Sequence, residues 1–180
     1  MIAVIHAHPY PSRSRACAAL VAAIGDLPGI DIRSLYTLYP DFDIDVAAEQ
    51  AAVDRARLVV WLHPLYWYTA PSLLKHWFDV VLTGGWAHGH GGTALKGKEC
   101  LWVTTTGDTE YRAEGAHGHR FAAFVPVIEQ TALYCGMRWL DPFVVHNAHA
   151  MDEAALRGEA ARLRERLDAW SAAQRAPHAA

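Results

Sequence analysis

Residues 58–82 of this 180-residue chain read LVVWLHPLYWYTAPSLLKHWFDVVL, and this stretch decides the fold. Residues 58–62 form an unbroken apolar run, which is typical of a strand buried on both faces of a parallel sheet. Pro64 ends that strand, and residues 72–82 carry apolar side chains at the helical spacings of three and four. A buried strand followed by an amphipathic helix is the repeating unit of an α/β sheet.

The same unit recurs along the chain. Strands are predicted at residues 2–6, 31–34, 58–62, 99–105 and 139–146, and Pro142 makes the last one irregular. Helices are predicted at residues 15–24, 46–56, 72–82, 120–135 and 152–173, with Gly25, Gly136 and Asp152 as end signals. This alternation predicts an α/β, flavodoxin-like doubly wound five-stranded parallel sheet of order 2-1-3-4-5 with helices on both faces. We expect one domain over residues 1–175 and a frayed tail at 176–180.

Composition limits the classes of function. The chain is 52% apolar and 19% charged with a net charge of -3, which indicates a folded domain without the basic surface that nucleic acid requires. Cys17, Cys100 and Cys135 form no CxxC pair, which favours a reduced compartment. The apolar N-terminal run is too short for a signal peptide, so we expect a cytoplasmic protein whose membrane association, at the inner membrane, would come through a partner.

The turn after the first strand reads HAHPYPSRSRAC at residues 6–17 and opens a helix. A helix N-terminus offers free N–H groups and a positive dipole end, so Ser12, Ser14 and Arg15 predict an anion cradle. Neither GxGxxG nor GxxxxGK is present, which argues against a dinucleotide Rossmann site and a nucleoside triphosphatase. The alternative is that Ser12 or Ser14 only caps the helix.

The histidines allow a second interpretation, a metal site. His6 and His8 are two residues apart, and HGHGG at 88–92 and VHNAH at 145–149 add further imidazoles. A catalytic metal site normally also has carboxylates or thiolates, and these clusters contain none. We therefore expect structural histidines and no metal.

Two more loops are predicted at the carboxyl edge of the sheet, where open α/β sheets bind ligands. The aromatic run Tyr66, Trp67 and Tyr68 suits a flat ring. In TTTGDTEYRAEGAHGH at 104–119, backbone N–H groups near Gly107 could meet the polar edge of that ring, and a phenol and an imidazole could stabilise charge on it. Ordinary loop residues, or core packing for Trp61, Trp77, Phe78 and Trp86, are the alternatives, and core packing is favoured for Trp77 and Phe78. The long connections 35–45 and 84–97 are rich in aromatics and are expected to cover a surface.

Several longer runs carry a family resemblance. They are AHPYP at 7–11, RSLYTLYPDFDIDVAAEQ at 33–50, HPLYWYTAPSLLKHWFDVV at 63–81, GWAHGHGGTALKGK at 85–98, TTG at 105–107, GAH at 115–117 and YCGMRWLDPF at 134–143. Through them the chain resembles the flavodoxin-like NAD(P)H:quinone oxidoreductases, and within these the ancillary flavoproteins of the glutathione-regulated potassium-efflux system (KefF type).

The resemblance implies an FMN-dependent homodimer with its active sites at the subunit interface. It assigns the FMN phosphate to the first turn, the ring and ribityl chain to the aromatic run, and the pyrimidine edge to the third loop. The implied cofactor-binding residues are His8, Ser14, Arg15, Ala16, Cys17, Leu65, Tyr66, Trp67, Tyr68, Thr105, Thr106, Gly107 and Asp108. Cys17 stands where the family commonly has asparagine and Asp108 where it has glycine, and we expect the Asp108 side chain to point to solvent.

The resemblance also implies the chemistry. NADH or NADPH would reduce the flavin and leave, and a quinone would then take the same place and accept two electrons, in a ping-pong sequence. Tyr111 and His117 stand six residues apart, like the tyrosine and histidine that stabilise the reduced flavin in related quinone reductases, and are the implied catalytic residues. Tyr66, Trp67 and Trp86 would wall the ring, with 84–92 as interface and substrate-site cover. Two alternatives stay open: a regulatory binding subunit of a potassium-efflux antiporter with little enzyme activity, and a histidine-based metal hydrolase.

Overall fold

The computed structural model describes residues 1–109 and 111–175, so the predicted tail at 176–180 lies outside the described residues. The described chain forms one five-stranded parallel sheet in the order β2-β1-β3-β4-β5, as predicted. The strands are β1 (Ile2–His6), β2 (Ile30–Ser34), β3 (Leu58–Pro64), β4 (Glu99–Thr105) and β5 (Arg138–Val145). The helices are α1 (Arg15–Ile24), α2 (Leu35–Leu38), α3 (Val46–Arg55), α4 (Ser72–Val81), α5 (Val125–Tyr134) and α6 (Glu153–Arg175), with short 3₁₀ turns at Pro11–Arg13 and Phe121–Ala123.

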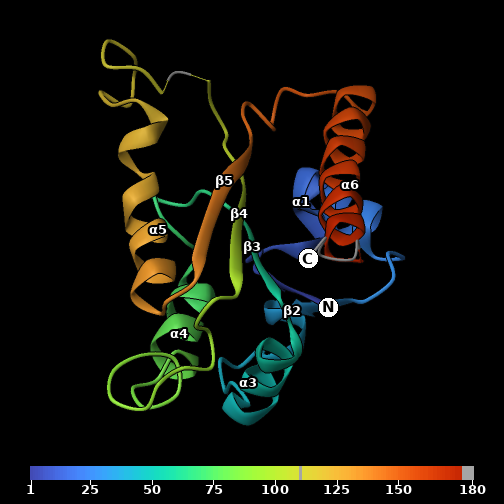
Figure 1. The fold of residues 1–180 in the computed structure, drawn as a ribbon. Helices are drawn as coiled ribbons and strands as arrows, with labels where there is room; N and C mark the ends of the chain where they lie inside the picture. The colour runs from blue at the N-terminus through green and yellow to red at the C-terminus, as the bar shows by residue number, and fades with distance from the viewer. Residues whose placement is uncertain (110, 176–180) are drawn as a thin grey trace.

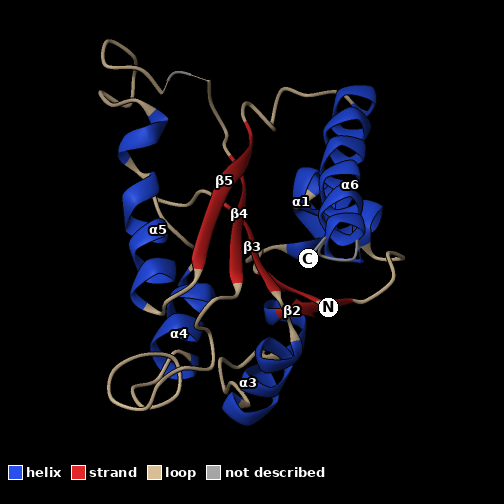
Figure 2. Ribbon diagram, viewed as in Figure 1, coloured by secondary structure: helices blue, strands red, loops and turns tan. Residues whose placement is uncertain are grey.

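Helices cover both faces of the sheet. Figure 1 shows α1 and α6 together on one face and α3, α4 and α5 on the other, and Figure 2 shows the red strands between these two blue layers. Each face has its own core, because every residue of β1, β3 and β4 is buried and successive side chains point to opposite faces. Trp61, Trp77 and Trp102 belong to the core under α3, α4 and α5, whereas Leu20 and Leu163 pack in the core under α1 and α6.

The helix predicted at 120–135 is divided in two. A 3₁₀ turn occupies Phe121–Ala123, and α5 begins only at Val125. Pro126 lies in the first turn of α5, where its missing N–H leaves no helical hydrogen bond unmade, and it cannot stand in a helix interior. The prediction of one continuous helix was therefore wrong.

The remaining predictions concern the ends and irregularities of helices and strands, and the structure confirms some of them and not others. The structure confirms Asp152 as the cap of α6, since its Oδ1 accepts from the Ala155 N–H at 2.8 Å. Gly136 has the left-handed φ of 73° expected after a helix, but Gly25 is right-handed with φ of -64°. Pro142 disturbs β5 as predicted, with a register shift opposite Leu101 and Val103. Part of the 35–45 connection is the short helix α2, which the sequence did not predict.

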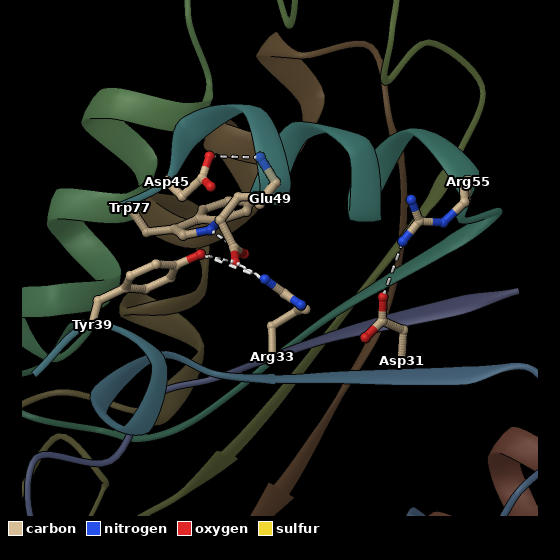
Figure 3. Close-up of polar contacts among 8 residues, drawn as sticks. Asp31, Arg33, Tyr39, Asp45, Glu49, Arg55 and Trp77 are labelled. Atoms are coloured by element: carbon tan, nitrogen blue, oxygen red, sulfur yellow. Dashed lines mark hydrogen bonds and ion pairs between the residues drawn. The ribbon is translucent and has the colours of Figure 1, made fainter. Parts of the chain in front are cut away.

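A buried carboxylate joins β2, α3 and α4. Glu49 is fully buried, and its two oxygens accept hydrogen bonds from three different side chains (Figure 3). Arg33 Nη2 and Tyr39 Oη both donate to Oε1 at 2.7 Å, and Trp77 Nε1 donates to Oε2 at 2.9 Å. The network fixes how the 35–45 connection and α4 pack on the sheet.

No helix in the described ranges 1–109 and 111–175 is long and apolar enough to cross a membrane.

Candidate functional site

Two adjoining cavities lie beyond the carboxyl ends of the strands. The first, which we call the cradle, has a volume of about 150 Å³, and the second, the ring cavity, about 270 Å³. Leu65, Gly107 and His149 line both, so the two cavities adjoin. Every residue on the implied cofactor-binding and catalytic lists lines one or both of them, whereas Ser12, which was also predicted in the anion cradle, lines neither. The cradle takes His8, Ser14, Arg15, Ala16, Cys17, Leu65, Tyr66, Thr105, Thr106 and Gly107, and the ring cavity takes Leu65, Trp67, Tyr68, Gly107, Asp108, Tyr111 and His117.

Ser14 is the most informative side chain of the cradle. It stands at the N-cap position of α1, yet its side chain makes no capping hydrogen bond. Its hydroxyl is buried and makes no hydrogen bond of normal geometry, although it lies close to the Cys17 thiol, which is a weak hydrogen-bond partner. A buried hydroxyl that neither caps nor pairs costs free energy unless a ligand satisfies it, so the capping interpretation fails for Ser14. The oxygen lies beside the free N–H groups of a helix N-terminus, where an anion is favoured.

The other cradle residues supply mostly donors. Tyr10 N donates to His8 Nδ1 at 3.1 Å, which leaves Nε2 as the protonated nitrogen of the neutral ring. Burial lowers the pKa of His8, so the neutral ring is favoured. Burial raises the pKa of Cys17 to about 11, so the thiol stays neutral and adds no negative charge to the cradle. Arg15 brings a guanidinium, anchored on the carbonyl oxygen of Met151.

A strained turn forms one wall of the ring cavity. Tyr66 and Thr69 exchange backbone hydrogen bonds of 3.1 and 3.0 Å, and the two residues between them, Trp67 and Tyr68, have φ of 49° and 63°. Two consecutive positive φ values define a type I′ turn, which normally takes asparagine and glycine. Aromatic side chains there carry a conformational cost, and Trp67 is nevertheless 90% exposed. A large apolar side chain held in this way is typical of a surface that binds a ligand.

Tyr111 and His117 form the opposite wall. Their rings stack at 4.1 Å with an interplanar angle of 10°, and His117 Nδ1 lies 3.5 Å from the Tyr68 hydroxyl. The expectation that Asp108 points to solvent holds only in part, because its side chain is 42% exposed but its Oδ2 lies 3.4 Å from His117 Nε2. The carboxylate therefore sits beside an imidazole that can offset its charge when protonated.

Sequence reasoning missed part of the lining. Arg13, Ala148 and His149 also line the cradle. An ideal Cβ at Gly107 would lie 2.9 Å from His149 Cδ2, so a larger residue at position 107 would displace the His149 ring. The run VHNAH at 145–149 could have pointed to Ala148 and His149, because the fifth strand must end at the same sheet edge as the others. Its histidines were interpreted from the sequence only as candidate metal ligands.

The histidines and tryptophans divide by location. Within residues 1–109 and 111–175, no group of three or more histidine, cysteine, aspartate or glutamate side chains could hold a metal ion. His6 is buried with its Nδ1 3.1 Å from Ser34 Oγ, and it does not line the cradle that His8 lines. Trp77 and Phe78 are core residues, as favoured. Trp86 packs partly buried against the same core and lines neither cavity of its own chain.

Comparison with known proteins places this geometry in a family. The family model for the flavodoxin-like fold (Flavodoxin_2) matches residues 1–167. The chain belongs to this flavodoxin-like family. Among its relatives is the glutathione-regulated potassium-efflux system ancillary protein KefF of Salmonella typhi, which is 52% identical over 171 residues, covering 94% of this chain and 97% of that protein.

Solved structures of the family are also similar. General stress protein 14 of Treponema denticola, in complex with FMN, superposes with a TM-score of 0.86 at 37% identity, covering 93% of this chain and 98% of that one. An NADPH-quinone reductase from P. pentosaceus superposes with a TM-score of 0.83 at 29% identity, covering 92% and 96%. Flavodoxin-like proteins of this kind thus include an FMN complex and a quinone reductase.

Proposed function

We propose that this protein is an FMN-dependent NAD(P)H:quinone oxidoreductase. The observation that carries the proposal is that a polar cradle adjoins an aromatic ring cavity at the carboxyl edge of a doubly wound sheet. FMN has a phosphate group joined to a planar ring by a polar chain, so its phosphate would fit the cradle and its ring the ring cavity. The FMN complex of a protein 37% identical to this one supports the choice of cofactor.

The cradle would hold the phosphate. Ser14 offers an unpaired hydroxyl, Arg15 a guanidinium and the first turn of α1 its free N–H groups. His8, Ala16 and Cys17 complete the lining, and the neutral thiol of Cys17 does not repel the anion. Arg13 joins this set although the resemblance did not name it.

The ring cavity would hold the isoalloxazine ring. When bound, FMN supplies two-electron redox chemistry, and the protein supplies orientation and electrostatics. Trp67 and Tyr68 on the strained turn would cover the ring, and Thr105, Thr106, Gly107 and Asp108 would meet its pyrimidine edge. We propose that NADH or NADPH and the quinone occupy the same place in turn, which gives ping-pong kinetics.

Tyr111 and His117 would stabilise the negative charge that develops on reduction. A phenol donates a hydrogen bond at neutral pH, and burial raises the pKa of Tyr111 further, which keeps its proton in place. His117 is held from three sides by Tyr111, Tyr68 and Asp108. Such preorganised donors stabilise a transition state without a reorganisation cost.

We further propose a homodimer through the face of α4 and α5. A groove of about 510 Å³ lies there, and its lining includes Val127 and Tyr134, which are 60% and 66% exposed. Exposed apolar side chains grouped in this way mark interaction surfaces. In the dimer, Trp86 and the 84–97 connection would cover the partner's ring cavity. Val127→Asp should yield monomers in light-scattering chromatography, and an unchanged mass would contradict the dimer face.

A second function is regulatory. Relatives 50–52% identical over nearly the whole chain are named as ancillary proteins of the potassium-efflux system, which favours association with a membrane antiporter. The two functions are separable: co-purification with an antiporter together with negligible NAD(P)H oxidation would favour the regulatory subunit, and turnover without co-purification would favour the enzyme.

A pair of serine variants tests the cofactor site. Ser14→Ala removes the unpaired buried hydroxyl and should weaken FMN binding by about tenfold, the effect of losing one hydrogen bond to a charged group. Ser12→Ala removes an exposed hydroxyl two residues away and should leave the affinity within twofold. Fluorescence titration of FMN measures both, and equal affinities for the two variants would contradict the cradle assignment.

A further inference from the structure

His63 is a buried histidine that the proposed reaction does not use. It is fully buried on β3, and its two ring nitrogens have different partners. Trp102 Nε1 on β4 lies 2.8 Å from His63 Nε2, and His63 Nδ1 lies 2.9 Å from the carbonyl oxygen of Pro64. An indole N–H can only donate, so Nε2 must accept. The proton of the neutral ring is therefore on Nδ1, which donates to Pro64.

Burial keeps the His63 ring neutral. Burial lowers the pKa of His63 to about 4, against the smaller opposing effect of its hydrogen bond to Pro64. A protonated ring would have to donate from Nε2, which would break the bond from Trp102. One tautomer is thus maintained at neutral pH.

The bond to Pro64 fixes the entry to the strained turn. On the other side of the same peptide group, Leu65 N donates to Thr105 O at 2.8 Å. The peptide between Pro64 and Leu65 is therefore held at both its oxygen and its nitrogen. The turn that follows contains two left-handed aromatic residues, and such strain persists only where the surroundings impose it.

Trp102 also contacts the opposite wall of the ring cavity. Its ring stacks on Phe121 with centroids 5.6 Å apart and an interplanar angle of 21°. Phe121 in turn meets Tyr111 edge to face at 5.8 Å. One indole thus reaches both walls, the strained turn through His63 and Tyr111 through Phe121.

We propose that His63 and Trp102 are positioning residues that hold the two walls of the ring cavity at a fixed separation. The identity of the ligand rests on the proposed function, but the positioning does not. His63 fixes the Pro64 carbonyl through its hydrogen bond, and Trp102 fixes the Tyr111 ring through Phe121. Neither side chain lines the ring cavity itself.

A pair of tryptophan variants tests the proposal. Trp102→Phe removes the N–H donor and leaves His63 Nε2 without its partner. Trp61→Phe is the matched control, because Trp61 lies on the neighbouring strand, is equally buried, and its Nε1 has no hydrogen-bond partner to lose. Hydrogen exchange of the Tyr66 and Thr69 amides, measured without FMN, should accelerate about tenfold in Trp102→Phe and stay within twofold in Trp61→Phe.

Two further measurements keep the outcome decisive. In wild type, ¹⁵N spectra should show His63 protonated at Nδ1, and protonation at Nε2 would overturn the proposal without any variant. FMN affinity should fall about tenfold in Trp102→Phe but not in Trp61→Phe. Equal exchange rates in the two variants would also overturn it. If wild type binds no FMN, the proposed function fails, while the exchange and tautomer results still decide the positioning role.

Discussion

The Glu49 network allows one stability prediction to be worked out in detail. Glu49→Gln keeps the shape of the side chain and removes its charge. In either orientation of the amide, its NH₂ group must face a donor: Trp77 Nε1 on one side, or Arg33 and Tyr39 on the other (Figure 3). A buried donor left unsatisfied costs about 1–3 kcal/mol, and bonds that lose their charge weaken by about 1 kcal/mol.

Together these effects should lower the free energy of unfolding by about 2–4 kcal/mol. The loss is no larger because 21% of the Arg33 side chain is exposed, so water still hydrates part of its charge. Urea unfolding followed by circular dichroism measures it, with an unchanged m-value expected. The control is Glu153→Gln, whose side chain is 83% exposed and 3.5 Å from Arg157, and which should change stability by less than about 0.5 kcal/mol. A loss below about 0.5 kcal/mol for Glu49→Gln would refute the reasoning.

Three further predictions follow from buried groups and from the site. Because burial lowers the pKa of His63 from 6.5 to about 4, the unfolded chain binds a proton that the folded chain does not; the contribution of His63 to stability, present above pH 6.5, should fall by about 3 kcal/mol as the pH drops to 4, and His63→Gln should reduce the slope of the urea–pH profile there, leaving the similar contribution of His6. The three cysteines are buried with raised pKa values, so a thiol reagent at pH 8 should label none in the native protein and three after unfolding, and rapid native labelling would argue against the packing. Tyr111→Phe combined with His117→Ala should slow reduction by NAD(P)H about 100-fold in stopped flow while FMN stays bound, and an unchanged rate would remove these residues from catalysis.

The sequence predicted the sheet because parallel strands buried on both faces leave continuous apolar runs, and the helices between them leave a different period. It also identified the loops that form the site, because every strand of such a sheet ends at one edge. The division of the helix at 120–135 was missed although Pro126 was visible, because the apolar spacing continues through it.

What the sequence could not give are the contacts that depend on side-chain direction. Whether Ser14 caps α1 or leaves its hydroxyl free depends on one rotamer. The approach of Asp108 to His117 depends on the path of a loop without regular structure. The bond from Trp102 to His63 joins residues 39 positions apart, and only the register between β3 and β4 brings them together.

The most direct test of the central claim is a spectroscopic cycle on the purified protein with added FMN. The account predicts one bound FMN per chain, loss of its yellow absorbance when NADH or NADPH is added without oxygen, and return of the colour when a quinone follows. A protein that binds no FMN, or whose bound FMN is not reduced by either nucleotide, would contradict the account.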